Sequence, residues 1–335
     1  MSALFSPIEL RGLTLPNRVM VAPMCQYSAE NGEATDWHFA HINSLALSGA
    51  AMFCIEASAV EAIGRITHGC LGLWNDACEA ALKPIIATAR RHSRAAIAIQ
   101  LAHAGRKASS RRPWEGGQVI SIAEGGWQAQ APSAVPHKEG EPPPLALDGA
   151  GLARIRDAFV DATRRAMRLG LDAIELHCAH GYLLHQFLSP ISNRRTDQYG
   201  GSLANRMRFP LEVFEAIRAA FPVEKPVGIK VSATDWVEGG WDLPQVRRGI
   251  ETARHRLGRL LLRRRLAEAE DRARPRLPGA VCGSDPARDR HDHHRGRPDH
   301  EGQPCRGNRG LRQGRHGRAG ARHALRPALG LARRR

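Results

Sequence analysis

A break in composition at residue 245 decides where this chain can build a hydrophobic core. The last 90 of its 335 residues contain no Lys, Met, Phe, Trp or Tyr, and all 25 of their positive charges are Arg. All 17 aromatic side chains therefore lie in residues 1–245. Because a core needs large apolar side chains, only residues 1–245 can form an ordinary one, and they are ample for a single large domain.

The net charge divides at the same residue. The chain has 49 basic and 33 acidic side chains, which gives a formal charge of +16. Residues 1–245 hold 24 of each sign, so the whole excess lies in residues 246–335. A basic composition is typical of nucleic-acid binding, but residues 1–245 have no net charge, so that interpretation is open only for the Arg-rich tail.

The sequence carries no signal for a membrane span, for export or for a disulfide framework. No apolar run reaches the roughly 18 residues that a membrane span needs, and residues 1–5 lack the charged and apolar regions of a signal peptide. Seven cysteines form an odd set without a C-x-x-C pair, which argues against a disulfide framework and a zinc ribbon. We therefore expect a cytoplasmic protein with reduced thiols.

Short runs rich in Val, Ile and Ala alternate with amphipathic stretches, as expected of strands buried between layers of helices. The five expected strands are Val19–Ala22, Met52–Ala57, Ala95–Leu101, Ala173–His177 and Val227–Val231. Apolar residues recur every three or four positions in residues 152–166 and 203–221, which predicts crossover helices there.

This alternation fits a doubly wound sheet or a closed (β/α)₈ barrel, and the loops favour the barrel. Neither of the first two strand-to-helix loops contains G-x-G-x-x-G, the signature of a dinucleotide-binding turn. Polar residues instead follow strand after strand, as they do at the C-terminal face of a barrel enzyme. The long connection Arg111–Asp148 has little periodicity, and we expect it to form a lid or surface excursion over that face.

The loop after the fourth expected strand carries His177 and His180, three residues apart, and then Tyr182. Two imidazoles could bind a metal, but no further ligand stands at metal-site spacing nearby, so we expect none. The two imidazoles could instead hydrogen-bond one carbonyl oxygen, as the donors of an oxyanion site do, with Tyr182 as a phenolic acid within reach. Taken alone, the motif also fits two buried histidines bonded to backbone carbonyls.

Five linked motifs together resemble those of the old yellow enzyme family, in particular its bacterial branch with a Cys and a Tyr after the first strand. The resemblance covers residues 5–245. In chain order the motifs are A-P-M-C-Q-Y (22–27), E-A-S-A-V (56–60), Q-L-A-H-A-G-R-K (100–107), the stretch 177–190 and N-R-R-T-D-Q-Y-G-G-S (193–202).

The resemblance implies an FMN-dependent ene-reductase on a (β/α)₈ barrel, which oxidises NADPH or NADH and reduces an activated C=C bond. The positions that match the family's flavin contacts are Ala22, Pro23, Met24, Cys25, Ala57, Gln100 and Lys230. Gln100 would hydrogen-bond the pyrimidine edge of the flavin, and Lys230 would place a cation near N1 and O2 of the reduced ring. The family usually has Arg at this last position; Lys keeps the charge and loses the planar fork.

The same resemblance assigns the substrate side of the site. His177 and His180 would bind the carbonyl oxygen of an α,β-unsaturated substrate, so that its β-carbon accepts hydride from flavin N5. Tyr182 would then protonate the α-carbon. Tyr27 would be a second hydrogen-bond donor to the substrate, and Cys25 a thiol in contact with the flavin; a core tyrosine and a core thiol are the alternative interpretations.

The tail does not fit a barrel, which needs three more strands. Residues 246–335 contain only three Val and Ile residues together, and the family holds the FMN phosphate after strands seven and eight. A shifted reading frame in a GC-rich gene would produce the excess of Arg, Ala, Gly and Pro. Read one base later with allowed codons, residues 322–335 give the family's C-terminal signature, and Ser-Val-Glu from Val246 onward places the slip near Gln245.

We therefore expect residues 1–245 to be an incomplete FMN-binding barrel portion that encodes strands 1–5. Residues 246–335 would be an Arg-rich, low-order tail in which strands 6–8 are lost. Such a chain would not close a barrel or retain FMN, because an open sheet buries too little surface and exposes two edges.

The predicted function is that of the in-frame protein. Its partner would be a small enone-type molecule, with no membrane and no nucleic acid expected. The in-frame protein could form a homo-oligomer, and the sequence leaves the oligomeric state open. The competing interpretations are a non-functional truncated barrel and a basic-tailed nucleic-acid-binding protein. The histidine patch His291–His294 in the tail could suggest a metal site, an interpretation that we do not adopt.

Overall fold

The computed structural model of the chain describes residues 2–257. The predictions for the chain beyond residue 257, including the histidine patch His291–His294 and the shifted-frame strands, lie outside the described residues. Helix α6 (Leu243–Leu257) crosses residue 245, so regular structure continues past the predicted domain boundary.

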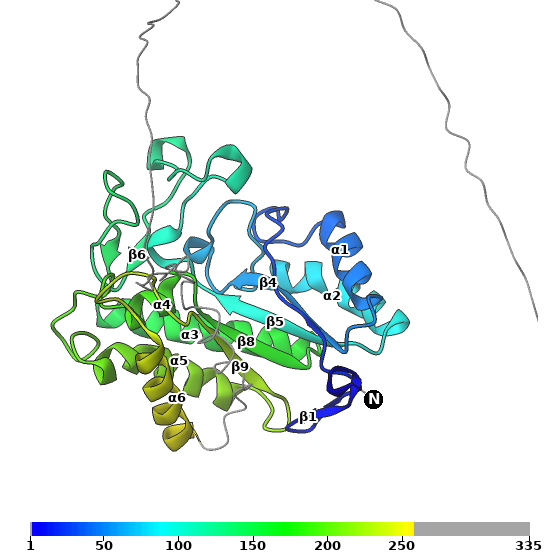
Figure 1. Ribbon diagram of the computed structural model, residues 1–335. Coiled ribbons are helices and arrows are strands. Elements are labelled where there is room, and N and C mark those ends of the chain that lie inside the picture. The colour runs from blue at the N-terminus through cyan, green and yellow to red at the C-terminus, as the bar shows by residue number, and fades with distance from the viewer. Residues whose placement is uncertain (1, 258–335) are drawn as a thin grey trace, which may run out of the picture. The chain divides into compact units, whose positions relative to one another are not determined.

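Five parallel strands form the central sheet (Figure 1), and they are the five that the apolar runs predict. They are β3 (Met20–Val21), β4 (Met52–Ala59), β5 (Ala96–Ala102), β8 (Ala173–Cys178) and β9 (Val227–Val231). Their order in the sheet is their order along the chain. A doubly wound sheet reverses its strand order at a switch point, whereas a barrel adds each strand beside the last. The described sheet is therefore of the (β/α)₈ type and comprises five of its strands.

Helices connect the strands, as the amphipathic stretches predict. The α-helices before α6 are α1 (Asp36–Ala46), α2 (Asp76–His92), α3 (Gly149–Arg168), α4 (Leu183–Leu188) and α5 (Leu203–Ala220). Side-chain caps fix where three of them begin, because Asn75, Asp148 and Ser202 each accept a hydrogen bond from a first-turn backbone N–H. Short 3₁₀ helices are η1 (Ala3–Phe5), η2 (Ala62–Gly64) and η3 (Gly105–Lys107). None of the described helices is long and apolar enough to cross a membrane.

Alternation along the strands gives the sheet two different faces. On the outer face, large side chains such as Phe53, Ile99 and Leu176 are completely buried and pack with the helices in the main hydrophobic cluster. This cluster holds the sheet and its helical layer together through the burial of apolar surface.

The inner face of the sheet carries small side chains at the N-terminal ends of its strands. Cys54, Ala98 and Ala173 are buried there in a second cluster. An antiparallel hairpin of β1 (Ile8–Leu10) and β2 (Leu13–Leu15) contributes Leu15 to the same cluster. The hairpin therefore covers one end of the inner face and leaves the polar C-terminal end for chemistry.

The predicted excursion Arg111–Asp148 contains only short elements. They are η4 (Pro113–Glu115), η5 (Ile122–Glu124), β6 (Gln130–Ala131) and β7 (Leu145–Ala146). The Trp114 ring lies 5.7 Å from the Tyr27 ring in an edge-on contact, and Trp127 Nε1–H donates to the Ile63 carbonyl at 2.8 Å. The excursion therefore reaches loops at the C-terminal end of the sheet, as predicted.

Candidate active site

The strand register brings the predicted flavin contacts on the strands to one face of the sheet. Ala57 is paired with Gln100 in the β4–β5 ladder, and His177 with Lys230 in the β8–β9 ladder. Gln100 is in turn paired with Glu175. Directly paired residues in a sheet point to the same side, so these five side chains share the inner face.

A β-bulge makes this arrangement possible. The β4–β5 register shifts between Ile55 and Ala57, so one residue of β4 is left unpaired. The buried carboxylate of that residue, Glu56, accepts a hydrogen bond from the Gln26 N–H at 2.9 Å and lies 3.3 Å from His38 Nε2 on α1. The bulge thus places Ala57 beside Gln100 and lets Glu56 hold the loop that follows β3.

Gln100 is only 2% exposed, and its Nε2 donates to Glu175 Oε1 at 2.6 Å. Burial raises the pKa of Glu175, which the hydrogen bond from Gln100 and the charge of Lys230 partly offset. Glu175 had no predicted role. A carboxylate at an inward-facing position of a buried strand was the signal that could have identified it.

His177 is held in a defined tautomer. Its Nδ1 accepts a hydrogen bond from the Ala179 N–H at 3.3 Å, so the proton of the neutral ring lies on Nε2. Burial, reinforced by His180 and Lys230, lowers the pKa of His177 to about 3. The ring is therefore neutral at pH 7 and offers one N–H donor, as an oxyanion site requires.

The His180–Gly181 turn brings the second imidazole and the phenol to His177. Both residues of the turn have positive φ, 60° and 72°, and Ser232 after β9 accepts a hydrogen bond from the His180 N–H at 2.9 Å. The ring centroids of His180 and Tyr182 lie 5.1 Å and 5.0 Å from that of His177. The three predicted catalytic side chains therefore form one cluster.

Tyr182 and Lys107 form a contact that the sequence did not predict. The Lys107 ammonium lies 4.9 Å from the centre of the Tyr182 ring and donates to the His180 carbonyl at 3.1 Å. Burial raises the pKa of Tyr182, so the phenol keeps its proton at neutral pH. The position of Lys107 at the end of the Q-L-A-H-A-G-R-K motif was the available signal.

A second unpredicted pair holds the turn itself. His185 on α4 accepts the Gly181 N–H on Nδ1 at 2.8 Å, and its Nε2 lies 3.0 Å from Asp235 Oδ1. Ser189 Oγ and the Trp241 N–H donate to the other oxygen of Asp235 at 2.6 Å and 2.8 Å. This chain of hydrogen bonds connects the turn to the loop after β9.

The remaining predicted contacts lie in the loop after β3. Ala22, Pro23 and Met24 are placed there, and the Met24 side chain is 57% exposed. Cys25 and Tyr27 lie within hydrogen-bonding reach of each other, and burial raises the pKa of both groups. The structure thus places the thiol and the second predicted donor next to each other, with the thiol beside the Ala57 N–H.

The donor set fits the ring of FMN. The Gln100 amide and the Lys230 ammonium lie on the same face of the sheet, and the small residue Ala57 is paired with Gln100 there. The described residues do not include the segment to which the resemblance assigns the FMN phosphate. In residues 2–257 no three His, Cys, Asp or Glu side chains lie close enough to hold a metal ion.

Several known proteins are similar to this chain in sequence and in fold. The sequence pattern of the NADH:flavin oxidoreductase / NADH oxidase family matches residues 3–281. An NADH:flavin oxidoreductase of Gibberella zeae is 48% identical over 238 residues, which cover 70% of this chain and 57% of that protein. An NADPH dehydrogenase of Listeria innocua is 43% identical over 245 residues, which cover 72% of this chain and 67% of that protein.

A solved structure agrees with these relatives. The old yellow enzyme homologue of Zymomonas mobilis has a TM-score of 0.63 and 27% identity, over 75% of this chain and 71% of that one. The chain therefore spans less than two thirds of the length of its Gibberella relative and somewhat more of the other two proteins.

Proposed function

Because the chain belongs to the NADH:flavin oxidoreductase / NADH oxidase family, we propose that its site is that of an NAD(P)H-dependent ene-reductase acting on α,β-unsaturated carbonyl compounds. The predicted old yellow enzyme family is confirmed, as are FMN and a nicotinamide as its cofactors. The observation that carries the proposal is the neutral His177 ring, with its donor Nε2–H, clustered with His180 and Tyr182.

Seven inner-face and loop positions would hold the flavin ring in this proposal. They are Ala22, Pro23, Met24 and Cys25 in the loop after β3, and Ala57, Gln100 and Lys230 on the inner face. Lys230 would stabilise negative charge on the pyrimidine side of the ring, and Gln100 would donate or accept a hydrogen bond at the edge of that ring. Bound FMN would supply the hydride that it has taken from NADPH or NADH.

The chain's own residues polarise the substrate and deliver the proton. His177 Nε2–H and the ring of His180 would donate to the carbonyl oxygen, which makes the β-carbon more electrophilic. Tyr182, whose pKa is raised by burial, would hold its proton until the α-carbon becomes basic. Tyr27 would add a second hydrogen bond to the substrate from the β3 loop.

The double substitution His177→Ala and His180→Ala tests this assignment. The test uses the chain in which residues 246–335 are replaced by the translation one base later, because that chain should bind FMN. Without both donors, its enone-dependent oxidation of NADPH should fall at least about 10²-fold, since one oxyanion donor alone is commonly worth about 10²–10³. Binding of FMN should not change. His92→Ala, an exposed histidine at the end of α2, is the matched control. Turnover that survives the double substitution would show that the oxyanion assignment is wrong.

The proposal includes a cytoplasmic location and, for the in-frame protein, the possibility of a homo-oligomer. The competing interpretations are a non-functional truncated barrel and a basic-tailed nucleic-acid-binding protein. A non-functional barrel would give no turnover with FMN and enone under any condition. A nucleic-acid-binding tail would give salt-dependent retention on DNA.

A further inference from the structure

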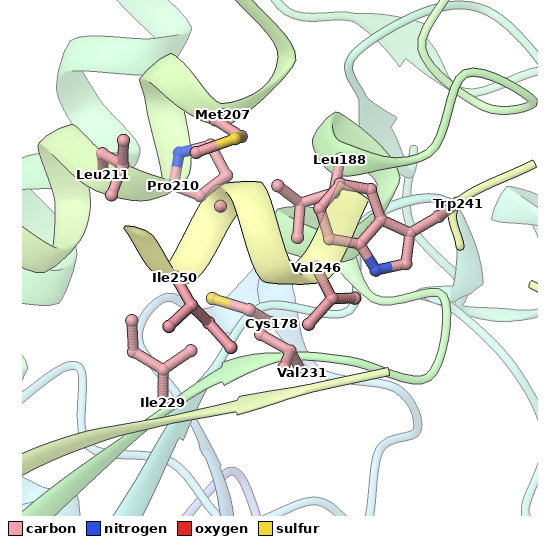
Figure 2. Close-up of a pocket in the computed structure, with 11 residues that line it drawn as sticks. Cys178, Leu188, Met207, Pro210, Leu211, Ile229, Val231, Trp241, Val246 and Ile250 are labelled. Carbon is pink, nitrogen blue, oxygen red and sulfur yellow. The ribbon is translucent and has the colours of Figure 1, made fainter. Parts of the chain in front are cut away.

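An apolar cavity lies on the outer face of the sheet, between β9, α5 and α6 (Figure 2), with a volume of about 70 Å³. It is separate from the candidate active site, because His177 and Lys230 occupy the inner face of the same strands. The side chains that line it include Cys178, Met207, Ile229, Val231, Trp241 and Ile250.

A glycine on α6 leaves the space open. Gly249 faces Met207 and Trp241, and a β-carbon at this position would lie 3.5 Å from the end of Met207 and 3.8 Å from the Trp241 ring. These are ordinary van der Waals distances, so a β-carbon fits at this position without displacing its neighbours. The neighbouring helix residues Val246 and Ile250 line the cavity on either side.

The side chains that line the cavity offer no strong hydrogen-bond partner to a water molecule. They are aliphatic or aromatic except for the thioether of Met207 and the thiol of Cys178. Burial raises the pKa of the Cys178 thiol, so the thiol stays neutral at pH 7. The indole N–H of Trp241 already donates to the Ser232 carbonyl at 2.9 Å. A cavity that opens to solvent on one side but offers water no hydrogen bond favours an apolar guest. An enclosed apolar cavity of about 150 Å³ is known to admit benzene or xenon.

We propose that this cavity is a binding site for one small, uncharged apolar molecule of about the size of xenon. The Cys178 sulfur faces the cavity from β8 (Figure 2), and a polarisable sulfur favours a polarisable guest. Ile229, Val231 and Ile250 are only partly buried, so the guest can enter between β9 and α6. The proposal does not depend on flavin binding or on the ene-reductase activity.

Xenon dissolved under pressure is the probe, and the full chain is the sample. The ¹²⁹Xe chemical shift should depend on protein concentration in the wild type, and Gly249→Leu should remove at least half of that dependence by filling the space. Gly149→Leu is the matched control, because Gly149 is an exposed helical glycine with nothing within 4 Å of its β-carbon position. That control should behave like the wild type.

Two results would overturn the proposal. One is a wild-type shift no larger than that of Gly249→Leu, and the other is an equal loss in Gly149→Leu. Circular dichroism establishes that each variant is folded. If Gly249→Leu does not fold, Gly249→Ala replaces it, since its β-carbon fits without displacement, and a smaller loss of the same sign is then required.

Discussion

The two ends of the sheet are packed very differently. Around β4, β5 and β8 the outer face is sealed, and Phe53, Ile97 and Leu176 are at most 1% exposed beneath the helices. Around β9 the neighbouring outer-face residues Ile229 and Val231 are only partly buried and border a cavity. Close packing therefore extends through most of the described chain and fails where α6 covers the last strand.

The difference coincides with the predicted slip in the reading frame near Gln245. Helix α6 begins before that point and continues after it, and the glycine that leaves the cavity open, Gly249, comes after it. Under that prediction, the codons after Gln245 were selected in another frame, so the residues that they now encode were not selected to fill this space. Within residues 2–257, moreover, no strand pairs with the free edge of β9.

The largest expected effect comes from restoring the frame. A chain in which residues 246–335 are replaced by the translation one base later should purify with bound FMN and show its visible absorbance. The reason is that closing the barrel pairs the edge of β9 and adds the phosphate site. The chain as written should retain no FMN under the same conditions. Retention of FMN by the chain as written would refute the need for closure, and the nucleotide sequence across codons 240–260 tests the shifted frame itself.

A matched pair of substitutions would sharpen the comparison between the two ends. Ile155→Ala on α3 removes a completely buried side chain from the sealed end and should lower the free energy of unfolding by about 2–5 kcal/mol. Ile250→Ala on α6 enlarges an existing cavity at a partly buried position and should cost less than about 1.5 kcal/mol. Urea unfolding of both variants measures the difference. Equal losses would mean that the two ends are equally well packed.

The sequence alone predicts much of this architecture. The five apolar runs identify the five strands to within one or two residues of their ends, and loop chemistry distinguishes the barrel type from a doubly wound sheet. The cluster of His177, His180 and Tyr182 follows from a three-residue spacing at the end of a strand. These features are local, so a periodic pattern or a short motif is enough to predict them.

Features that depend on contacts distant in sequence could not be predicted. The bulge that aligns Ala57 with Gln100 depends on the register between β4 and β5, which no single segment encodes. The pair His185 and Asp235 is separated by 50 residues and meets only because α4 and the loop after β9 lie at the same end of the sheet. The cavity beside Gly249 likewise exists only in the packed structure.

The stability of the β8–β9 junction should depend on pH through His177. Its pKa is about 3 in the folded protein, because of burial first and then His180 and Lys230, against an ordinary value of 6.5. Between pH 6.5 and 3 the unfolded chain therefore binds a proton on this ring that the folded chain does not bind. His177 lowers the free energy of unfolding little above pH 6.5, and increasingly as the pH falls toward 3. Between pH 7 and pH 5 the expected loss is about 2 kcal/mol.

Urea unfolding at both pH values, in the wild type and in His177→Asn, isolates this contribution. On acidification, the free energy of unfolding of His177→Asn should fall by about 2 kcal/mol less than that of the wild type. For His92→Asn, an exposed control, it should fall as much as for the wild type. The same slope in His177→Asn and the wild type would mean that water reaches the ring and that the β9 end is looser than the structure has it.

The smallest expected effect is a gain at the poorly packed end. Gly249→Ala should raise the free energy of unfolding by about 1 kcal/mol, because alanine is favoured over glycine inside a helix by about that amount. Its methyl group also gains contacts with Met207 and Trp241 at ordinary distances. Gly149→Ala, at the exposed start of α3, should give a smaller gain. A loss of stability in Gly249→Ala would mean that α6 packs more tightly against β9 than the cavity indicates, and the contrast between the two ends of the sheet would disappear.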